Sequence, residues 1–430
     1  MKSVNFHRLV SRRETLSMLG GVSVLGVSKA LFPTWMPRLA FRQNGAPGDV
    51  LISIFLRGGM DGLNAVVPFG EGARYYDSRP TIAIAEPNTP NGAINLDGFF
   101  GLHPKLAPLK DIYDAGALAI VHAAGSPDPT RSHFDAMTYM ERGIPGNKSV
   151  TSGWIARHLE TAAWQNDSPF RAVGMGAMVP ASLNGAVTSL ALQSIADFHL
   201  GGREDQIEAV RRTLASLYAV TPESDFGRQL LAAQASNTFN VIDLLAQIGS
   251  SAYTPSGGAV YPETEFGLGM RQIAQLIKAG VGLEVACVDL GGWDTHENQG
   301  GAEGEQANVL AELAAGIAAL YTDLGELMGS VTLVAMSEFG RRVQENASSG
   351  TDHGHGNAMF VLGGGINGGK VYADWRGLAP EALDEGDVAI TTDYRDVLGE
   401  LLTSRILNPA LDQIFPNHTS NFRGIAKPRG

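Results

Sequence analysis

Largely apolar runs recur along the chain and alternate with segments of helical spacing. Rich in Val, Ile and Leu, the runs predict buried strands at 49–56, 117–122, 283–290 and 331–336, and shorter strands at 359–362 and 388–390. Apolar residues three or four positions apart predict helices at 104–115, 132–142, 152–163, 303–327 and 394–402. Strand, helix and strand over 283–336 imply a parallel pair joined by a right-handed crossover. The pattern therefore predicts an α/β fold with a largely parallel central sheet.

Between the second and third long strands the pattern changes. Residues 174–184 are small and irregular, which predicts loops, whereas 203–248 is polar and periodic and predicts two or more helices. We expect a helical insertion over about 203–280. Because α/β enzymes often exceed the average domain length, residues 49–430 are expected to form one domain.

Composition narrows the class of protein. The chain is 44% hydrophobic and 18% charged, as in ordinary globular proteins. Its net charge of -12 would repel a phosphate backbone, so we expect no nucleic-acid partner. An anionic substrate would need local help from metal ions or arginines. Cys287 is the single cysteine, and its apolar surroundings predict a buried, inert thiol.

The N-terminus carries targeting information. Ser11-Arg12-Arg13-Glu14 precedes a moderately apolar run over 16–31, a pattern that resembles a twin-arginine export signal. The run is too short and too diluted by glycine and serine to be a stable membrane span. We expect residues 1–48 to be the signal and a linker, the export machinery to be a partner, and the protein to be periplasmic or secreted.

Residues able to bind metals follow the predicted strands. Asp61 follows the first strand, 126–133 the second, Asp294 and His296 the third, and 338–342 the fourth. In an open α/β sheet, ligands bind outside the carboxyl ends of the strands. The sequence therefore predicts one site built from several strand exits.

Two clusters within this set combine carboxylate and imidazole. Asp352, His353 and His355 lie within four residues, and Asp294 with His296 repeats the combination earlier in the chain. Imidazole nitrogen and carboxylate oxygen bind Zn²⁺ or Mn²⁺ readily, and Mg²⁺ or Ca²⁺ remain alternatives. Both clusters are also compatible with polar turns. Taken together they predict a centre of one or two divalent metals.

Two further carboxylates are candidate ligands with open alternatives. Asp61 precedes glycine, and Asp-Gly is also a common turn pair. Glu338 follows a buried strand, where an ion pair with Arg341 or Arg342 would equally satisfy it. We include both among the expected metal ligands.

The residues before the helix at 132–142 are the catalytic candidates. Ser132 can serve as a nucleophile or cap the helix, and Thr130 is the second choice of nucleophile. Arg131 can clamp an anion, and His133 is an imidazole without a settled role. A near-match to a phosphate-binding loop at 364–371 fails because Val371 replaces the required Ser or Thr, so an NTPase is rejected. A nicotinamide or flavin enzyme is also not expected.

Several motifs occur together in this chain, at 55–64, 131–135, 291–296, 337–341 and 351–356. With them the chain resembles, over roughly residues 8–408, a large bacterial family of twin-arginine-exported proteins of unknown function placed near the alkaline phosphatase and sulfatase superfamily. The resemblance implies a three-layer α/β/α sandwich with metal ligands at Asp61, Asp294, His296, Asp352 and His353. One departure is that Glu338 holds the strand-end position where that superfamily usually has an Asp-His pair.

We therefore expect a metal-dependent hydrolase of a phosphate or sulfate ester, with Ser132 as nucleophile. Its substrate would be a small anionic ester or an esterified glycan. The alternative is a non-catalytic exported binding or assembly protein that keeps the fold and a structural metal.

Overall fold

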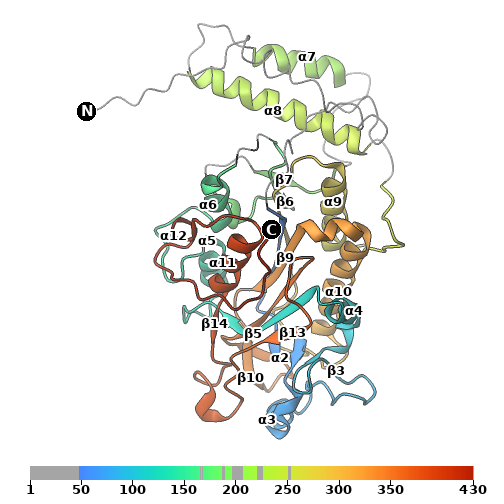
Figure 1. The fold of residues 1–430 in the computed structure, drawn as a ribbon, viewed down its shortest axis with the longest axis vertical. Coiled ribbons are helices and arrows are strands. Elements are labelled where there is room, and N and C mark those ends of the chain that lie inside the picture. Colours follow the sequence, from blue (N-terminus) through green and yellow to red (C-terminus); the bar gives the residue numbers. More distant parts are fainter. Residues whose placement is uncertain are drawn as a thin grey trace, which may run out of the picture. The chain divides into compact units, whose positions relative to one another are not determined.

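A nine-stranded sheet forms the centre of the computed structural model (Figure 1). Its strands are β1 (Val50–Leu56), β5 (Leu118–Gly125), β6 (Ala172–Met175), β7 (Leu190–Leu192), β8 (Val285–Leu290), β9 (Val331–Ser337), β12 (Asn357–Gly363), β13 (Lys370–Tyr372) and β14 (Thr392–Asp393). Their order is β13-β5-β12-β9-β1-β8-β6-β7, with β14 also paired to β5. β12 runs antiparallel to β5 and β9, and the other pairs are parallel. The largely parallel sheet expected from the sequence is confirmed.

The structure describes residues 48–164, 166, 168–185, 189–195, 207–219, 226–249 and 253–429. All of these belong to one unit, residues 41–430. The twin-arginine segment and the linker, up to residue 47, lie outside the described residues.

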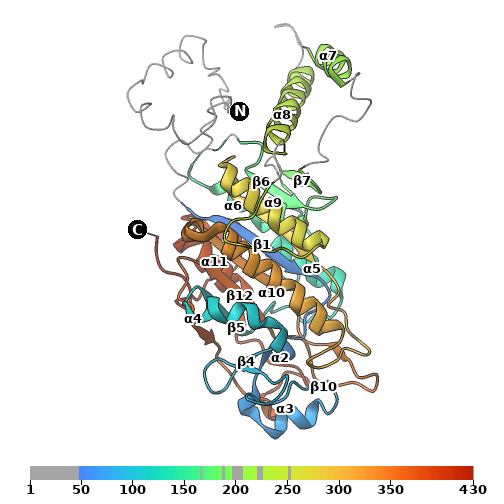
Figure 2. The same cartoon turned by 90° about the vertical axis from the view of Figure 1, so that its right-hand side faces the viewer.

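Helices cover both faces of the sheet. On one face lie α9 (Glu265–Ala279), α10 (Glu305–Leu324) and the 3₁₀ helix η3 (Pro104–Leu109); Figure 2 shows α9 and α10 in front of β1. On the other face lie α5 (His133–Arg142), α6 (Trp154–Thr161), α11 (Tyr394–Ser404) and α12 (Leu411–Ile414). Successive side chains of β1 point to opposite faces, so Ile52 and Ile54 join the first core and Leu51 and Phe55 the second. The three-layer α/β fold is confirmed.

The described chain has further elements, two of them long helices and the others short. They are α2 (Gly62–Ala65), β2 (Val66–Val67), η2 (Phe69–Glu71), α3 (Ala73–Ser78), β3 (Ile94–Asn95), β4 (Gly101–Leu102), α4 (Lys110–Asp114), η4 (Ala181–Leu183), α7 (Ile207–Leu217), α8 (Phe226–Gly249), η6 (Gly325–Ser330), β10 (Arg341–Glu345), β11 (Thr351–His353), η7 (Pro380–Ala382). β10 and β11 form an antiparallel pair beside the central sheet. This pair carries His353 and therefore helps to position the site.

Three local predictions differ from the structure. Residues 388–390 are not a strand, and β14 pairs with β5 a few positions later. Part of the expected loop at 174–184 belongs to β6, whose Ala-Val-Gly-Met sequence lacks a strong β signature. The expected helix at 104–115 begins as η3, because Pro108 has no N–H to donate to an α-helical bond, and continues as α4.

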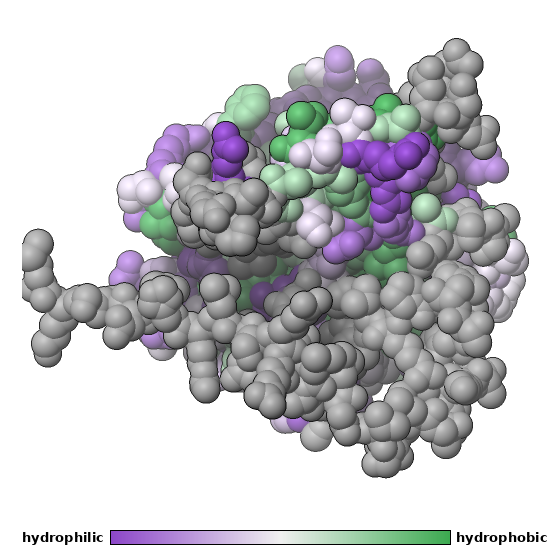
Figure 3. All heavy atoms as spheres, turned by 90° about the horizontal axis from the view of Figure 1, so that it is seen from above, coloured by the Kyte–Doolittle hydropathy of each residue, from purple (hydrophilic) through white to green (hydrophobic). Residues whose placement is uncertain are grey.

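The helical region between β7 and β8 has two parts. Arg211 of α7 forms an ion pair with Asp243 of α8, whereas α9 packs with α10 on the sheet. On the face shown in Figure 3, hydrophilic and hydrophobic residues are interspersed over the described part. By length and composition one helical stretch, Glu305–Ser330, would pass as a membrane span, and its Leu310 and Ile317 are buried in the core.

Candidate metal centre

The candidate site lies where several strand exits meet. β1, β8 and β9 are neighbours and run parallel, so their carboxyl ends share one edge of the sheet. Asp294 and His296 follow β8, and Glu338 follows β9. In the β10–β11 pair, Arg341 stands opposite His353, and His133 begins α5. The fold thus brings together residues from three distant parts of the sequence.

Three imidazoles surround the Asp294 carboxylate. From Asp294 Oδ1, the Nε2 atoms of His133, His296 and His353 lie at 3.3, 3.1 and 3.3 Å. His296 Nε2 and His353 Nε2 are 2.9 Å apart. Ligand atoms of His133, Asp294 and His353 all lie within 4.8 Å of one another. This is the donor set that zinc sites use, three imidazoles and one carboxylate.

The outer nitrogen of each imidazole already has a partner. His133 Nδ1 lies 2.7 Å from Glu338 Oε1, and His353 Nδ1 lies 2.8 Å from the Arg131 carbonyl oxygen. His296 Nδ1 is 3.4 Å from Asp352 Oδ1. A proton on Nδ1 fits the oxygen partners of His133 and His353, and this assignment turns the lone pair of Nε2 toward Asp294. Lone pairs that face a carboxylate repel it unless a cation lies between them, and metal-binding histidines typically have such outer partners.

The pKa values of His133 and His353 are shifted in opposite directions by their surroundings. The hydrogen bond to Glu338, opposed by burial and assisted by the charge of Asp294, raises the pKa of His133. Burial lowers the pKa of His353, which keeps that ring neutral and able to bind a metal. A proton on His133 and a metal ion would therefore compete for one position.

Arg341 fixes the carboxylate at the centre. Burial favours the neutral form of Asp294, but the hydrogen bond and charge of Arg341 outweigh it and lower the pKa of Asp294 to about 2. Arg341 Nη2 donates to Asp294 Oδ1 at 2.7 Å. The same buried guanidinium donates to the carbonyl oxygens of Gly59, Trp293 and Thr351 at 2.6, 3.0 and 2.9 Å. It therefore ties together the segments after β1 and β8 and the start of β11.

Glu338 supports His133 from behind. Its side chain is buried, and Oε1 accepts from the Gly58 N–H at 2.8 Å as well as from His133. The Ser337 hydroxyl lies 3.0 Å from its other oxygen. Glu338, which was expected from the sequence to bind a metal, therefore lies in the structure as the hydrogen-bond partner of His133.

Asp61, also expected to bind the metal, is not brought into this group. One carboxylate oxygen accepts from Arg79 at 3.0 Å and from the Leu63 N–H at 3.2 Å, where it caps α2. The other accepts from Arg79 and from Gln299 Nε2, the latter at 2.7 Å. The side chains of Asp61 and Arg79 are fully buried, so the guanidinium needs this carboxylate to balance its charge. No sequence motif links Arg79 to the site, and its role was missed.

Three other predicted residues lie around the centre. His355 turns away, with Nδ1 3.1 Å from Asp384 Oδ2. The Arg131 guanidinium pairs with buried Asp387, so Arg131 contributes its carbonyl oxygen to the centre and not an anion clamp. Asp352 accepts from Asn346 at 3.1 Å, and this bond lowers its pKa.

The two candidate nucleophiles differ in their contacts. Ser132 is exposed at the N-cap of α5, and within the described residues its side chain makes no capping hydrogen bond. Thr130 Oγ1 instead accepts from the Ser132 N–H at 3.2 Å. The Ser132 hydroxyl, directly before His133, is therefore the freer of the two.

Fold and site together define an α/β protein with a cluster of histidine and aspartate side chains that could hold a metal ion. The chain belongs to the family described as protein of unknown function (DUF1501), which it matches over residues 115–403. Membership of a family of unknown function, expected from the sequence, is confirmed. A search of curated proteins finds no match.

Solved structures give distant likenesses. The PH0037 protein from Pyrococcus horikoshii is 12% identical, with 74% of this chain and 86% of that chain covered and a TM-score of 0.29. An alkaline phosphatase from the Antarctic bacterium TAB5 is 10% identical, with 74% and 91% covered and a TM-score of 0.27. The lipoteichoic acid synthase LtaP from Listeria monocytogenes is 8% identical, with 90% and 77% covered and a TM-score of 0.25. At these TM-scores the likenesses carry no conclusion about activity.

Proposed function

We propose that this protein is an exported, metal-dependent hydrolase of a phosphate or sulfate ester. One observation carries the proposal: three imidazole Nε2 atoms converge on the ionised Asp294 carboxylate while their outer nitrogens are engaged elsewhere. His133, Asp294 and His353 would hold the ion, with the half-exposed His296 as a fourth ligand. This nitrogen-rich set suits Zn²⁺ or Mn²⁺ better than Mg²⁺ or Ca²⁺, which prefer oxygen.

The chemistry follows from the residues beside the centre. A divalent metal would polarise an ester oxygen and offset its negative charge. The Ser132 oxygen would form a bond to phosphorus or sulfur, and its proton would go to the departing ester oxygen, which leaves as the alcohol. Water would then hydrolyse the seryl ester and release phosphate or sulfate. A small anionic ester or an esterified glycan is the substrate class we propose.

Metal analysis with ester turnover tests the proposal. Purified protein should hold metal and turn over aryl phosphate or aryl sulfate esters. His353→Ala should lose both, whereas Ser132→Ala should keep the metal and lose turnover. His418→Ala is the matched control, because His418 also pairs with a carboxylate, that of Asp396, at 2.8 Å. Metal-free wild-type protein, or full metal content and turnover in His353→Ala, would refute the proposal.

The position of Asp61 favours one alternative. The resemblance implies that this aspartate binds a metal, yet Arg79 and Gln299 occupy its carboxylate. A centre reduced in this way suits a non-catalytic binding or assembly protein with a structural metal. That alternative holds if wild type and Ser132→Ala bind metal, are equally inert on a broad ester panel, and lose only thermal stability when the metal is removed.

Export is proposed on the N-terminal sequence. Arg12 and Arg13 precede the apolar run at 16–31 and would direct the folded protein through the twin-arginine route. Changing both arginines to lysine should leave the uncut protein inside the cell. Fractionation of cells that express the paired variants measures this, and unchanged export of the double-lysine form would count against the route.

A further inference from the structure

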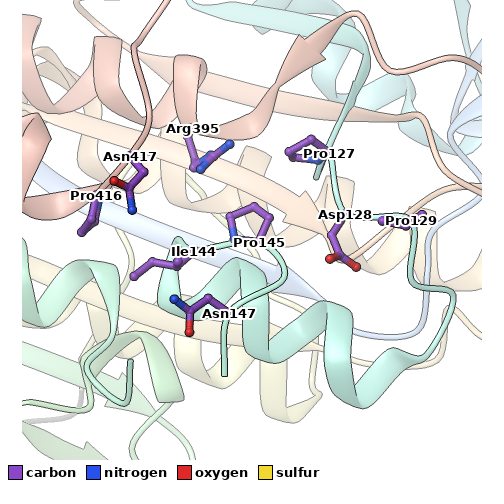
Figure 4. Close-up of a pocket in the computed structure, with 9 residues that line it drawn as sticks. All are labelled: Pro127, Asp128, Pro129, Ile144, Pro145, Asn147, Arg395, Pro416 and Asn417. Carbon is purple, nitrogen blue, oxygen red and sulfur yellow. The ribbon is translucent and has the colours of Figure 1, made fainter. Parts of the chain in front are cut away.

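A pocket of about 390 Å³ lies between Pro127, Pro129, Pro145 and Pro416, and we call it the proline pocket (Figure 4). Pro127 and Pro129 follow β5, Pro145 follows α5, and Pro416 follows α12. Its volume is within the range of small-molecule sites. Each proline ring fixes its own backbone angle, so the apolar walls are already ordered before a ligand arrives.

Arg395 supplies to this pocket a guanidinium group that is held in place by Asp393. The residue is 9% exposed, and Nε and Nη2 donate to Asp393 at 3.0 and 2.6 Å. Within the described residues Nη1 has no hydrogen-bond acceptor, and it is not enclosed. Figure 4 shows the side chain reaching from α11 toward Pro127 and Pro145. The Nη1 amino group of a well-held guanidinium, with its two N–H donors, is thus left for a ligand.

Other polar side chains that line the pocket, those of Asp128, Asn147 and Asn417, offer both hydrogen-bond acceptors and donors. Asp128 Oδ1 accepts from the Thr130 N–H at 2.9 Å, and within the described part its Oδ2 accepts no hydrogen bond. The Asn147 side-chain oxygen accepts from the Ser149 N–H at 2.8 Å, which leaves its amide N–H groups unused there. Asn417 adds one amide donor and one acceptor. Asp128 and Arg395 are the charged residues among those that line the pocket, and their charges are opposite, so the lining carries no net charge.

We propose that the proline pocket binds an uncharged sugar unit. Sugar hydroxyls both donate and accept, which matches the mixture of Asp128, Arg395 and the two amides, and a lining without net charge suits a neutral ligand. The proline rings can cover the apolar C–H faces of the sugar. An extended peptide would take backbone N–H bonds from its partner, and the four prolines have none to offer.

The pocket is close enough to the metal centre to hold part of the same molecule. Pro129 is four residues from His133, a stretch of chain that spans at most about 14 Å. A glycan whose ester lies at His133 could therefore place a neighbouring sugar in the pocket. This role as a subsite rests on the proposed hydrolase function, whereas sugar binding in the pocket does not.

Binding of unesterified sugars to the full-length protein tests the inference. Cellotriose, maltotriose and chitotriose are titrated calorimetrically at millimolar concentrations, with a proline-rich peptide as the competing class. At least one trisaccharide should bind, and Asp128→Asn should weaken it by roughly tenfold, because one hydrogen bond to a charged group is lost. Asp128→Asn keeps an oxygen for the Thr130 N–H. Asp97→Asn is its control, because Asp97 accepts from two N–H groups in a distant turn.

A second pair of variants avoids backbone strain. Asn417 has a φ of 61° and Asn91 a φ of 55°, so glycine fits both positions. Asn417→Gly should weaken sugar binding, and Asn91→Gly should not. His353→Ala should keep sugar binding even where it abolishes ester turnover, which separates this inference from the proposed function. If no trisaccharide binds, if Asp128→Asn and Asn417→Gly bind as well as wild type, or if only the peptide binds, the inference is wrong.

Discussion

Asp61→Ala is expected to destabilise the fold and to leave the metal centre intact. Asp61 and Arg79 are paired with both side chains fully buried, and removal of one partner from such a pair costs about 3–5 kcal/mol because the other charge stays buried. Over roughly 380 residues from Asp49 to Gly430, an unfolding entropy of about 2.1 cal/mol/K per residue totals ~0.8 kcal/mol/K. A loss of about 4 kcal/mol should therefore lower the Tm by roughly 5 K.

Thermal unfolding followed by circular dichroism, with metal analysis of the same samples, checks this expectation. The Tm should fall in metal-free and metal-loaded protein alike, with metal content unchanged. Adding Arg79→Met should recover part of the loss, because the unpaired charge is then gone. If Asp61→Ala lost a metal equivalent while the Tm of the metal-free protein stayed the same, Asp61 would be a ligand and the structural assignment would fail.

Two further predictions concern affinity and pH. Glu338→Gln should weaken metal binding roughly 10- to 100-fold, because the amide oxygen still accepts from His133 but carries no charge. Competition with a chelator measures the metal affinity, and an unchanged affinity would contradict this prediction. Burial lowers the pKa of His103 and His122 to about 4 and that of His158 to about 3. The pKa of each histidine in the folded protein lies below its unfolded value of about 6.5, so the unfolded chain takes up protons first as the pH falls. The free energy of unfolding should therefore be highest above about pH 6.5. It should fall toward pH 4 by up to about 1.4 kcal/mol per pH unit for each histidine. Urea unfolding at pH 7.5 and 5 should show the loss, and a slope that His158→Gln does not flatten would argue against it.

The long strands were predictable because burial on both faces leaves a local signature. β1, β5, β8 and β9 are largely apolar runs whose residues are nearly all buried. The short strand β6 and its neighbour β7 at the edge of the sheet have four and three residues and little β-branched character, and neither was predicted. The antiparallel direction of β12 depends on its neighbours in space, and no local pattern encodes it.

The sequence predicted those residues of the candidate site whose positions follow from where the strands of the sheet end. Asp294, His296 and His353 lie together because parallel strands end at one edge of the sheet and β11 returns to it. The roles of Asp61 and His133 depend on which side chain each one meets. Arg79 and Glu338 decide those roles, and both contacts are tertiary.

The centre is assembled from positions as far apart as His133 and His353, with Asp294 between them in sequence. No single stretch of unfolded chain contains the full set, so binding of a metal to this centre would be coupled to folding. Free metal at 100 times its dissociation constant would stabilise the native state by about 2.7 kcal/mol. Chelators would then act as mild denaturants, and the stability of the protein would depend on the metal supply of the compartment in which it folds.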